Sequence, residues 1–454
     1  MQRSRNGRQA ETRKPEPVNG AGVRNPRALQ RALAIGALPE QPREDEDGLG
    51  ELKELLRTAG VATAGEMIQV RAQPDPDRYF GRGKLADLKA EIARVDANLV
   101  ACDDELKPRQ ERNLEAALGV PVIDRTAVIL DIFADHANTA EGKLQVELAQ
   151  LQYNLARMRG LWTHLERLGA GRMDGGIGTR GPGESQIETD RRLARDRITA
   201  LRRKLRHTEQ VRGTMRERRE NSAVPSVALA GYTNAGKSTL LNALTGAGVG
   251  VGSRLFHTLD PTTRAYEHEG RRFLLTDTVG FIRKLPHELV EAFKATLEET
   301  RLADLIVHVV DASEDAEQRV AAIAAVDEVL EEIGAGERPR LLVFNKIDLL
   351  ADEARRHLLV GRSDAVGVSA ETGEGTNELR ERIATEFERT LRPLELLLPF
   401  SEGARLAELH ELAGDLEREE RADGVLVRAR VPAGLVHRFA EFAVNGDGDG
   451  DGDA

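Results

Sequence analysis

Residues 231–238 have the sequence GYTNAGKS, which matches the pattern G-x-x-x-x-G-K-[ST] of a phosphate-binding loop. Glycines allow such a loop to wrap so that its backbone N–H groups converge on the β-phosphate. We expect Lys237 to neutralise the β- and γ-phosphate oxygens and the Ser238 hydroxyl to ligate Mg²⁺. A short apolar run at 226–230 precedes the loop and a helical pattern at 239–244 follows it, as the motif requires.

Three further segments follow in the order that a guanine-nucleotide domain needs. Residues 277–280 (DTVG) end a strand; the Asp can hold a Mg²⁺-bound water and the Gly280 N–H can meet the γ-phosphate. Residues 345–348 (NKID) place Asp348 to accept hydrogen bonds from guanine N1–H and the 2-amino group, which adenine cannot match. Residues 369–371 stand where a backbone contact to the guanine oxygen is expected. Together they predict a guanine-nucleotide site.

Residues 255–264 lie between the phosphate-binding loop and Asp277, where switch I is expected. A threonine in this segment should complete the Mg²⁺ shell when GTP is bound. Residue chemistry alone does not choose among Thr258, Thr262 and Thr263.

The residue after Gly280 is Phe281, where Ras-like proteins have the glutamine that orients the attacking water. We therefore assign no catalytic residue and expect slow intrinsic hydrolysis, helped by a partner surface, a displaced switch or a cation. Asn234 stands where an asparagine in some GTPases helps to hold K⁺ near the phosphates. That hypothesis fails if GTP turnover is equal in Na⁺ and K⁺ buffers.

Length and composition predict a soluble protein of several domains. A chain of 454 residues suggests two to four domains, and 40% hydrophobic with 31% charged residues is typical of globular proteins. No apolar run approaches the roughly 18–20 residues of a membrane span, and no apolar segment of a secretory signal follows the Arg-rich start. The single cysteine, Cys102, excludes an internal disulfide framework and a Cys-based zinc cluster. We expect a cytoplasmic protein.

The expected fold is α/β. Strand-like and helix-like patterns alternate over residues 48–140, which predicts a small N-terminal α/β domain with a parallel sheet. Within it, residues 80–84 (FGRGK) open a helix and are a candidate for a second phosphate site. Residues 222–392 are expected to form a P-loop GTPase domain with a Rossmann-like sheet.

The two ends of the chain are expected to differ from these domains. We predict a disordered basic tail at 1–47, either solvated or contacting RNA, and a disordered acidic tail at 445–454. Residues 393–444 are expected to form a small C-terminal α/β module with a helix at 402–419. This module is either a ribosome-facing appendage or a cap.

Residues 141–221 are expected to form an antiparallel helical hairpin with a glycine-rich tip near 169–186. The first helix has apolar residues at heptad spacing, namely Leu144, Leu148, Leu151, Leu155, Met158, Trp162 and Leu165. The second places on one face Ala194, Ile198, Leu201, Leu205 and Thr208.

The second arm of this hairpin is strongly basic. Residues 187–219 hold 12 Lys/Arg against 5 Asp/Glu, so they are either a solvated face or an RNA-binding surface. The net charge of −11 would disfavour a nucleic-acid partner only if it were spread evenly along the chain. Without this arm and the basic first 31 residues the remainder is more acidic still, which would confine RNA contact to the two basic segments.

These residues resemble the HflX family of GTPases from about residue 50 to 390. The resemblance rests on the segments 122–126 (VIDRT), 141–151 (EGKLQVELAQL), 178–184 (GTRGPGE), 231–238 and 259–264 (LDPTTR). It implies a ribosome-associated GTPase that binds the large subunit, with the N-terminal region and hairpin near the peptidyl-transferase centre. It also implies that Thr258 is the switch I ligand of Mg²⁺. Met173, Asp174 and Ser185 depart from the family pattern at the tip.

The candidate residues follow from these segments. Nucleotide contacts are expected from Gly231, Tyr232, Thr233, Asn234, Ala235, Gly236, Lys237, Ser238, Thr239, Phe256, His257, Thr258, Leu259, Asp260, Asp277, Thr278, Val279, Gly280, Asn345, Lys346, Ile347, Asp348, Ser369, Ala370 and Glu371. The metal ligands are expected to be Ser238, Thr258 and, through water, Asp277. The candidate RNA contacts are Gly178, Thr179, Arg180, Gly181, Gly183, Arg191 and Arg192.

The expected activity is GTP hydrolysis, slow alone and stimulated by ribosomes. The expected ligands are GTP or GDP, Mg²⁺ and, by hypothesis, K⁺ at Asn234. The expected partner is the 50S subunit with its rRNA, and the protein is expected to be a monomer. With GTP bound, the protein is expected to split or rescue stalled 70S ribosomes. The alternatives are a subunit-assembly GTPase and an RNA-binding scaffold that uses GTP as a structural switch with little turnover. A membrane-transport GTPase is disfavoured because the chain has no spanning segment.

Overall fold

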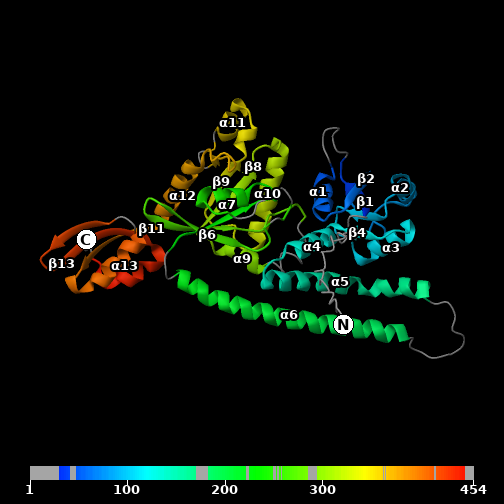
Figure 1. The fold of residues 1–454 in the computed structure, drawn as a ribbon, viewed down its shortest axis with the longest axis horizontal. Coiled ribbons are helices and arrows are strands. Elements are labelled where there is room, and N and C mark those ends of the chain that lie inside the picture. The colour runs from blue at the N-terminus through cyan, green and yellow to red at the C-terminus, as the bar shows by residue number, and fades with distance from the viewer. Residues whose placement is uncertain are drawn as a thin grey trace, which may run out of the picture.

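The structure is a computed structural model that describes residues 30–40, 48–169, 182–220, 224–248, 252, 255–256, 258–284, 294–360, 362, 365–413 and 416–444. Its elements gather around three sheets, of four, six and three strands. In Figure 1 the six-stranded sheet is central, the four-stranded sheet lies on one side of it and the three-stranded sheet on the other, with two long helices below. The α/β class expected from the sequence is confirmed.

The N-terminal sheet is parallel throughout and has the order β2-β1-β3-β4. Its strands are β1 (Arg31–Leu38), β2 (Ala62–Val70), β3 (Leu99–Cys102) and β4 (Val122–Asp124). Its helices are α1 (Gly50–Thr58), α2 (Arg82–Val95), α3 (Pro108–Leu118) and α4 (Arg125–His136). Parallel neighbours require crossover connections, which these helices supply.

The expectation of a disordered tail through residue 47 is wrong for β1 (Arg31–Leu38). This strand pairs with both β2 and β3, and residues 32–37 are buried. A strand that is covered on both faces has a continuous apolar sequence, here ALAIGAL, rather than an alternating one. The basic composition of the preceding residues masked this short run. Residues 1–29 and 41–47 lie outside the described part of the chain.

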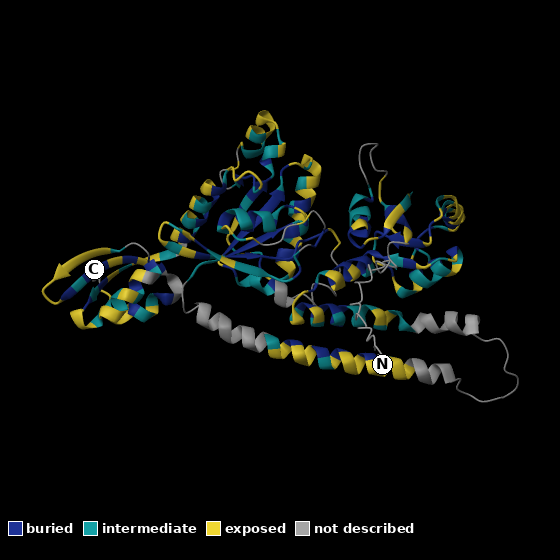
Figure 2. Ribbon diagram, in the orientation of Figure 1, coloured by how far each residue is buried: buried dark blue, intermediate teal, exposed yellow. Residues whose placement is uncertain are grey.

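The predicted helical hairpin consists of α5 (Ala140–Gly169) and α6 (Pro182–Glu220), which lie antiparallel (Figure 1). They pack through Leu148 against Ile198, Leu201 and Leu205, the spacing that the sequence indicated. The opposite face of α6 is exposed over its described side chains (Figure 2). No helix in the described ranges is both long and apolar enough to cross a membrane.

The central sheet has the order β10-β9-β8-β5-β7-β6, in which only β6 is antiparallel to its neighbour. Its strands are β5 (Ser226–Gly231), β6 (Thr262–His268), β7 (Arg271–Asp277), β8 (Leu305–Asp311), β9 (Arg340–Asn345) and β10 (Ala365–Gly367). The described helices around it are α7 (Lys237–Thr245), α9 (Lys294–Leu302), α10 (Ala316–Glu332), α11 (Asp352–Leu359) and α12 (Thr376–Thr390), with the short η2 (Ile347–Leu349). The carboxyl ends of its parallel strands carry the nucleotide motifs, as expected for this architecture.

The C-terminal sheet is antiparallel, in the order β11-β13-β12. It contains β11 (Leu391–Leu398), β12 (Glu417–Arg421) and β13 (Gly424–Pro432), with α13 (Gly403–Ala413) and the 3₁₀ segments η3 (Phe400–Glu402) and η4 (Ala433–Phe442). The expected helix at 402–419 is too long, because residues 417–421 form the edge strand β12. An edge strand tolerates the fully charged sequence EREER, which carries no apolar alternation to reveal it.

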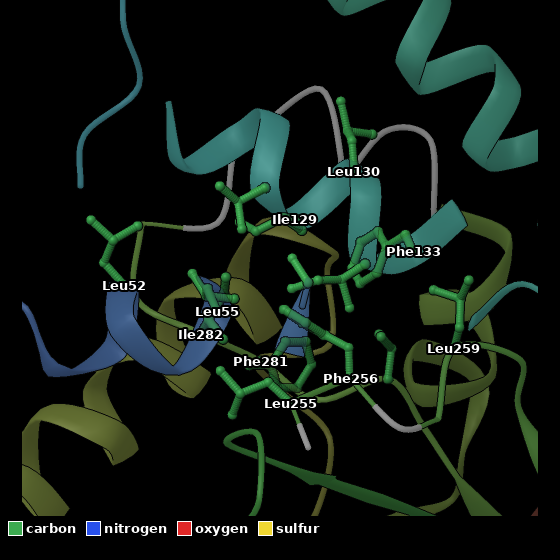
Figure 3. Packing of buried hydrophobic residues seen from close by; sticks show 14 of the residues in the cluster. Leu52, Leu55, Ile129, Leu130, Phe133, Leu255, Phe256, Leu259, Phe281 and Ile282 are labelled. Atoms are coloured by element: carbon green, nitrogen blue, oxygen red, sulfur yellow. The ribbon is translucent and has the colours of Figure 1, made fainter. Parts of the chain in front are cut away.

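One apolar cluster joins the N-terminal region to the central sheet. Figure 3 shows side chains of α1 and α4 meeting Leu255, Phe256, Leu259, Phe281 and Ile282. Phe256 meets Phe133 edge to face, with ring centroids 4.7 Å apart. Phe281 is fully buried in this cluster. The N-terminal region therefore packs directly on switch I and on the residues that follow Gly280.

Replacing Phe281 with alanine should leave a cavity in this cluster. Large-to-small changes of a buried Phe lower the free energy of unfolding by about 3–5 kcal/mol, so we expect a loss of that size in chemical denaturation. Phe400→Ala is the matched control, because that ring is 65% exposed and its loss should change the stability by only about 0.5 kcal/mol. Equal effects of the two changes would contradict the role of Phe281 in the core.

Candidate functional site

The phosphate-binding loop connects β5 to α7, and Lys237 is the first residue of that helix. Its side chain is buried, and its Nζ donates to the carbonyl oxygens of Gly231 at 3.0 Å and Tyr232 at 2.8 Å. Gly236 has a φ of +89°, and a Cβ there would lie 2.2 Å from the Asn345 Nδ2. Only glycine allows the loop to close against the base-binding segment at this point.

The loop is also tied to the segment after β7. The Thr233 N–H donates to the Phe281 carbonyl at 2.7 Å, and the Phe281 N–H donates to the Gly231 carbonyl at 3.1 Å. A Cβ on Gly280 would lie 2.8 Å from the Thr233 Cγ2 and 3.2 Å from the Lys237 Nζ. Glycine thus lets the Gly280 backbone approach the position where a γ-phosphate is expected.

Three oxygen-bearing side chains converge next to the loop. The Ser238 Oγ lies 2.6 Å from the Asp277 Oδ2 and 2.9 Å from the Thr258 Oγ1, and the Thr258 Oγ1 lies 3.0 Å from the same carboxylate oxygen. By contrast, Thr262 and Thr263 belong to β6, where the Thr263 hydroxyl lies 2.9 Å from that of Thr276.

This hydroxyl and carboxylate set suits Mg²⁺, a hard cation that prefers oxygen ligands. The residues therefore fit the metal that a GTPase fold generally uses. We expect that Ser238 and Thr258 would bind it directly and Asp277 through water. The geometry favours Thr258 over the other two threonines as the switch I ligand.

Thr278 and Val279 hold the sensor segment in place. The buried Thr278 hydroxyl donates to the Leu229 carbonyl at 2.6 Å, and Val279 lies in the apolar cluster with the N-terminal helices. We therefore expect these two side chains to position the backbone of Gly280 rather than to contact the nucleotide.

The base-binding segment is braced from two sides by Asn345. Its Nδ2 donates to the Ala235 carbonyl at 2.8 Å, and its Oδ1 accepts from the Ala370 N–H at 3.0 Å. One amide thus connects the phosphate-binding loop to residues 369–371. Ser369 is fully buried within that turn, whereas Glu371 is exposed.

Asp348 is the residue expected to accept from the base. Its Oδ1 is buried and has no hydrogen-bond partner among the described residues. Such an oxygen is costly to bury unless a donor meets it. Lys346 has a left-handed φ of +65°, and its Nζ lies 2.5 Å from the Asp311 Oδ2. We therefore keep the expectation that the unpartnered Asp348 oxygen accepts from the guanine base.

Several predicted residues do not meet the phosphate-binding loop through their side chains. Phe256 and Leu259 are buried in the cluster with α1 and α4, and Asp260 contacts the start of α5. The Tyr232 hydroxyl donates to Glu51 of α1 at 2.5 Å. His257 lies outside the described residues.

The candidate RNA contacts fall partly outside the described residues. Gly178, Thr179, Arg180 and Gly181 are not described, and Gly183 lies in the first turn of α6. Arg191 is half-buried and Arg192 is exposed on the same helix. The structure therefore places three of these residues on the basic helix α6 without describing the tip.

An ion-pair network between the N-terminal region and the central sheet was not expected from the sequence. Arg125, only 2% exposed, lies 2.7 Å from Glu51 and 2.8 Å from Asp103. Lys284, four residues after Gly280, lies 3.1 Å from Asp103 and 2.5 Å from Asp104. Burial alone would lower the pKa of Lys284, but these two carboxylates outweigh it and raise the pKa above its ordinary value.

Three family models match the chain in sequence order. They are described as GTP-binding GTPase N-terminal over residues 46–134, GTP-binding GTPase Middle Region over 136–219, and 50S ribosome-binding GTPase over 226–346. Together they cover strands β2 to β4 of the N-terminal sheet, the helical hairpin and strands β5 to β9 of the central sheet.

Curated relatives match over most of their own length. A GTPase HflX of Lacrimispora saccharolytica is 46% identical over 421 residues, which are 92% of this chain and 97% of that protein. A GTPase HflX of Escherichia coli is 44% identical over 410 residues, 89% of this chain and 94% of the relative. A solved GTP-binding protein from the archaeon Sulfolobus solfataricus, in complex with GDP, is 26% identical, covers 79% of this chain and 98% of its own, and has a TM-score of 0.41.

The buried Lys237 should make nucleotide binding depend on pH. Burial lowers the pKa of Lys237 from 10.5 to about 8, against the opposing effect of Asp277. Bound phosphates favour the ammonium form, so binding takes up a proton once the pH exceeds this value. We expect the affinity for Mg·GDP to be constant below about pH 8 and to fall up to about tenfold per unit above it.

Titrations with a fluorescent GDP between about pH 7 and about pH 9 measure this dependence. Lys237→Arg is the control, because a guanidinium stays charged over the whole range. That variant should bind more weakly but with little pH dependence. The same pH profile for both proteins would show that another group titrates.

Proposed function

Because the chain belongs to the HflX family of GTPases, we propose that it binds the large ribosomal subunit in the cytoplasm and, with GTP bound, splits or rescues stalled 70S ribosomes. Hydrolysis of GTP is the activity of this family. The large subunit as partner is supported by the match of residues 226–346 to a family described as a 50S ribosome-binding GTPase.

One structural observation carries the proposal. The N-terminal region contacts the central domain through two segments next to the nucleotide motifs: residues 255, 256, 259 and 260 of the expected switch I, and residues 281–284 after Gly280. The His136 Nδ1 donates to the carbonyl of Phe256, a residue of the cluster in Figure 3, at 2.7 Å. A change at the γ-phosphate therefore has a direct physical route to the N-terminal region, with no need for a third element.

The basic helix α6 supports RNA as the surface that this region meets. Its described exposed face carries Arg192, Arg195, Arg202, Arg203, Lys204 and Arg206 (Figure 2). The apolar face that packs on α5 fixes which way these side chains point. Lys and Arg arrayed along one helix face can neutralise successive phosphates, so ribosome binding should weaken as salt rises.

Sucrose-gradient profiles of 70S ribosomes test the proposal. Wild-type protein with GTP or a non-hydrolysable analogue should convert 70S particles into separate subunits and co-sediment with 50S. GDP should not, and neither should Lys237→Ala, which removes the phosphate-binding ammonium. Unchanged profiles and no co-sedimentation would contradict the proposal. Binding to free 50S without splitting would instead support a role in subunit assembly.

We also propose that K⁺ assists hydrolysis at Asn234. This residue is exposed at the phosphate-binding loop with a left-handed φ of +61°, and Phe281 cannot orient water. A cation there would offset charge that develops on the phosphates. GTP turnover should be faster in K⁺ than in Na⁺ buffer, and Asn234→Ala should remove the difference. Equal rates in the two buffers for the wild type would contradict it.

A further inference from the structure

Asp260 of switch I completes the N-terminus of the long helix α5. Its Oδ2 accepts from the backbone N–H groups of Asn138 at 3.1 Å and Thr139 at 2.9 Å, and its Oδ1 accepts from the Thr139 hydroxyl at 2.5 Å. Thr139 is itself the residue before α5, and its Oγ1 accepts from the Gly142 N–H at 2.9 Å. Thr139 and Asp260, 121 residues apart, thus share one helix cap.

The sequence of α5 leaves room for this carboxylate. In a common arrangement, a Glu or Gln three residues into a helix reaches back to the N–H of the capping residue. Here that position is Gly142, and a Cβ on it would lie 2.5 Å from the Asp260 Oδ1. The helix therefore lacks its own acidic side chain at the place where the carboxylate of switch I enters.

The same short segment reaches the metal site. Thr258 lies two residues before Asp260, and its hydroxyl is within 3.0 Å of Ser238 and Asp277. Leu259, between them, is buried in the cluster of Figure 3. Two residues span at most about 7 Å, so Thr258 must stay within that distance of the α5 cap while Asp260 remains on it, and the burial of Leu259 restrains the segment further.

Helix α5 is in turn held to the N-terminal sheet. The Tyr153 hydroxyl donates to Asp124 at 2.8 Å, and Arg157 lies 2.8 Å from Asp124 and 2.7 Å from Glu111. The N-terminal sheet and the start of the hairpin are therefore connected by buried or half-buried polar contacts. Asp260 links switch I to this whole unit rather than to an isolated helix end.

We propose that Asp260 is a positioning residue that holds Thr258 at the Mg²⁺ site by capping α5, so that GTP binding and the orientation of the hairpin favour each other. The coupling between Asp260 and GTP binding depends only on the GTPase activity. Any consequence of this coupling for ribosomes rests on the proposed function. Because a switch threonine joins the Mg²⁺ shell only in the GTP state, the anchor favours GTP over GDP. By thermodynamic reciprocity, GTP must favour the capped helix by the same factor.

Asp260→Ala tests the proposal through the ratio of two affinities. Loss of a helix cap corresponds to about a tenfold change in an equilibrium, so the Kd of a Mg²⁺-bound, non-hydrolysable GTP analogue should rise about tenfold. The Kd of Mg·GDP should change by less than about twofold, because Thr258 is not expected to bind Mg²⁺ in the GDP state. Asp260→Asn keeps one acceptor oxygen for the backbone N–H groups and should restore most of the loss.

Thr139→Val supplies the partner for a double-mutant cycle, because it keeps the shape of the side chain and removes the hydroxyl. If the two residues act as one cap, the double variant should bind the analogue no more weakly than Asp260→Ala. Glu267→Ala, which removes an exposed carboxylate from β6, is the control for lost charge and should leave both affinities unchanged.

Two results would overturn the proposal. If Asp260→Ala weakened the binding of the GTP analogue and of GDP equally, its effect would be a general loss of structure. The thermal unfolding transition would show such a loss independently, and so would the absence of rescue in the Asp260→Asn variant. Additive losses from Asp260→Ala and Thr139→Val would show that the two residues act independently. Neither result would bear on ribosome splitting, so failure of this proposal is distinguishable from failure of the proposed function.

Discussion

The apolar contact between helices α1 and α4 and the two nucleotide-sensing segments is the interaction on which the rest of the architecture depends. Phe256, Leu259, Phe281 and Ile282 are each at most 3% exposed because the N-terminal helices cover them. Complete burial of such a side chain stabilises a fold by about 1.5–3 kcal/mol. Separating the two parts would expose several of these side chains at once and lose this free energy for each of them. Switch I therefore cannot rearrange freely; its apolar side chains move with the N-terminal region or must be exposed to water.

Polar contacts at the edge of this cluster add specificity more than stability. Arg125 is nearly inaccessible to solvent and lies between Glu51 and Asp103, and desolvation opposes much of the attraction in such a pair. These ion pairs instead define how the segment after Gly280 is aligned against the N-terminal region. Lys284 can meet Asp103 and Asp104 only while the segment after Gly280 keeps its present path. Together with Asp260 on α5, they specify one arrangement of the switches against the N-terminal region.

Much of the nucleotide site could be predicted because its motifs are local. The loop at 231–238, the sensor at 277–280 and the base segment at 345–348 each follow a buried strand, and a parallel sheet brings such ends together. The helical hairpin could be predicted for the same reason, since heptad spacing is a local pattern. The strand β1 was missed because a sequence of small apolar residues lies beside a strongly basic segment.

The contacts between parts of the chain could not be predicted in the same way. Phe281 was interpreted as the absence of a catalytic glutamine, whereas the structure gives its ring a role in packing against α1 and α4. Asp260 was expected at the nucleotide, yet it caps a helix 121 residues away. The pairing of Arg125 with Glu51 and Asp103 was not expected either, because residues 122–126 entered only as a motif of the family resemblance.

The central claim is that the nucleotide state reaches the N-terminal region through switch I and the start of α5. Hydrogen exchange of the Asn138 and Thr139 amides tests it most directly, because these two N–H groups donate to Asp260. With a Mg²⁺-bound GTP analogue their exchange should be slower than with Mg·GDP, while amides in β13 of the C-terminal sheet exchange equally in both states. Identical exchange of Asn138 and Thr139 in the two nucleotide states would contradict the account.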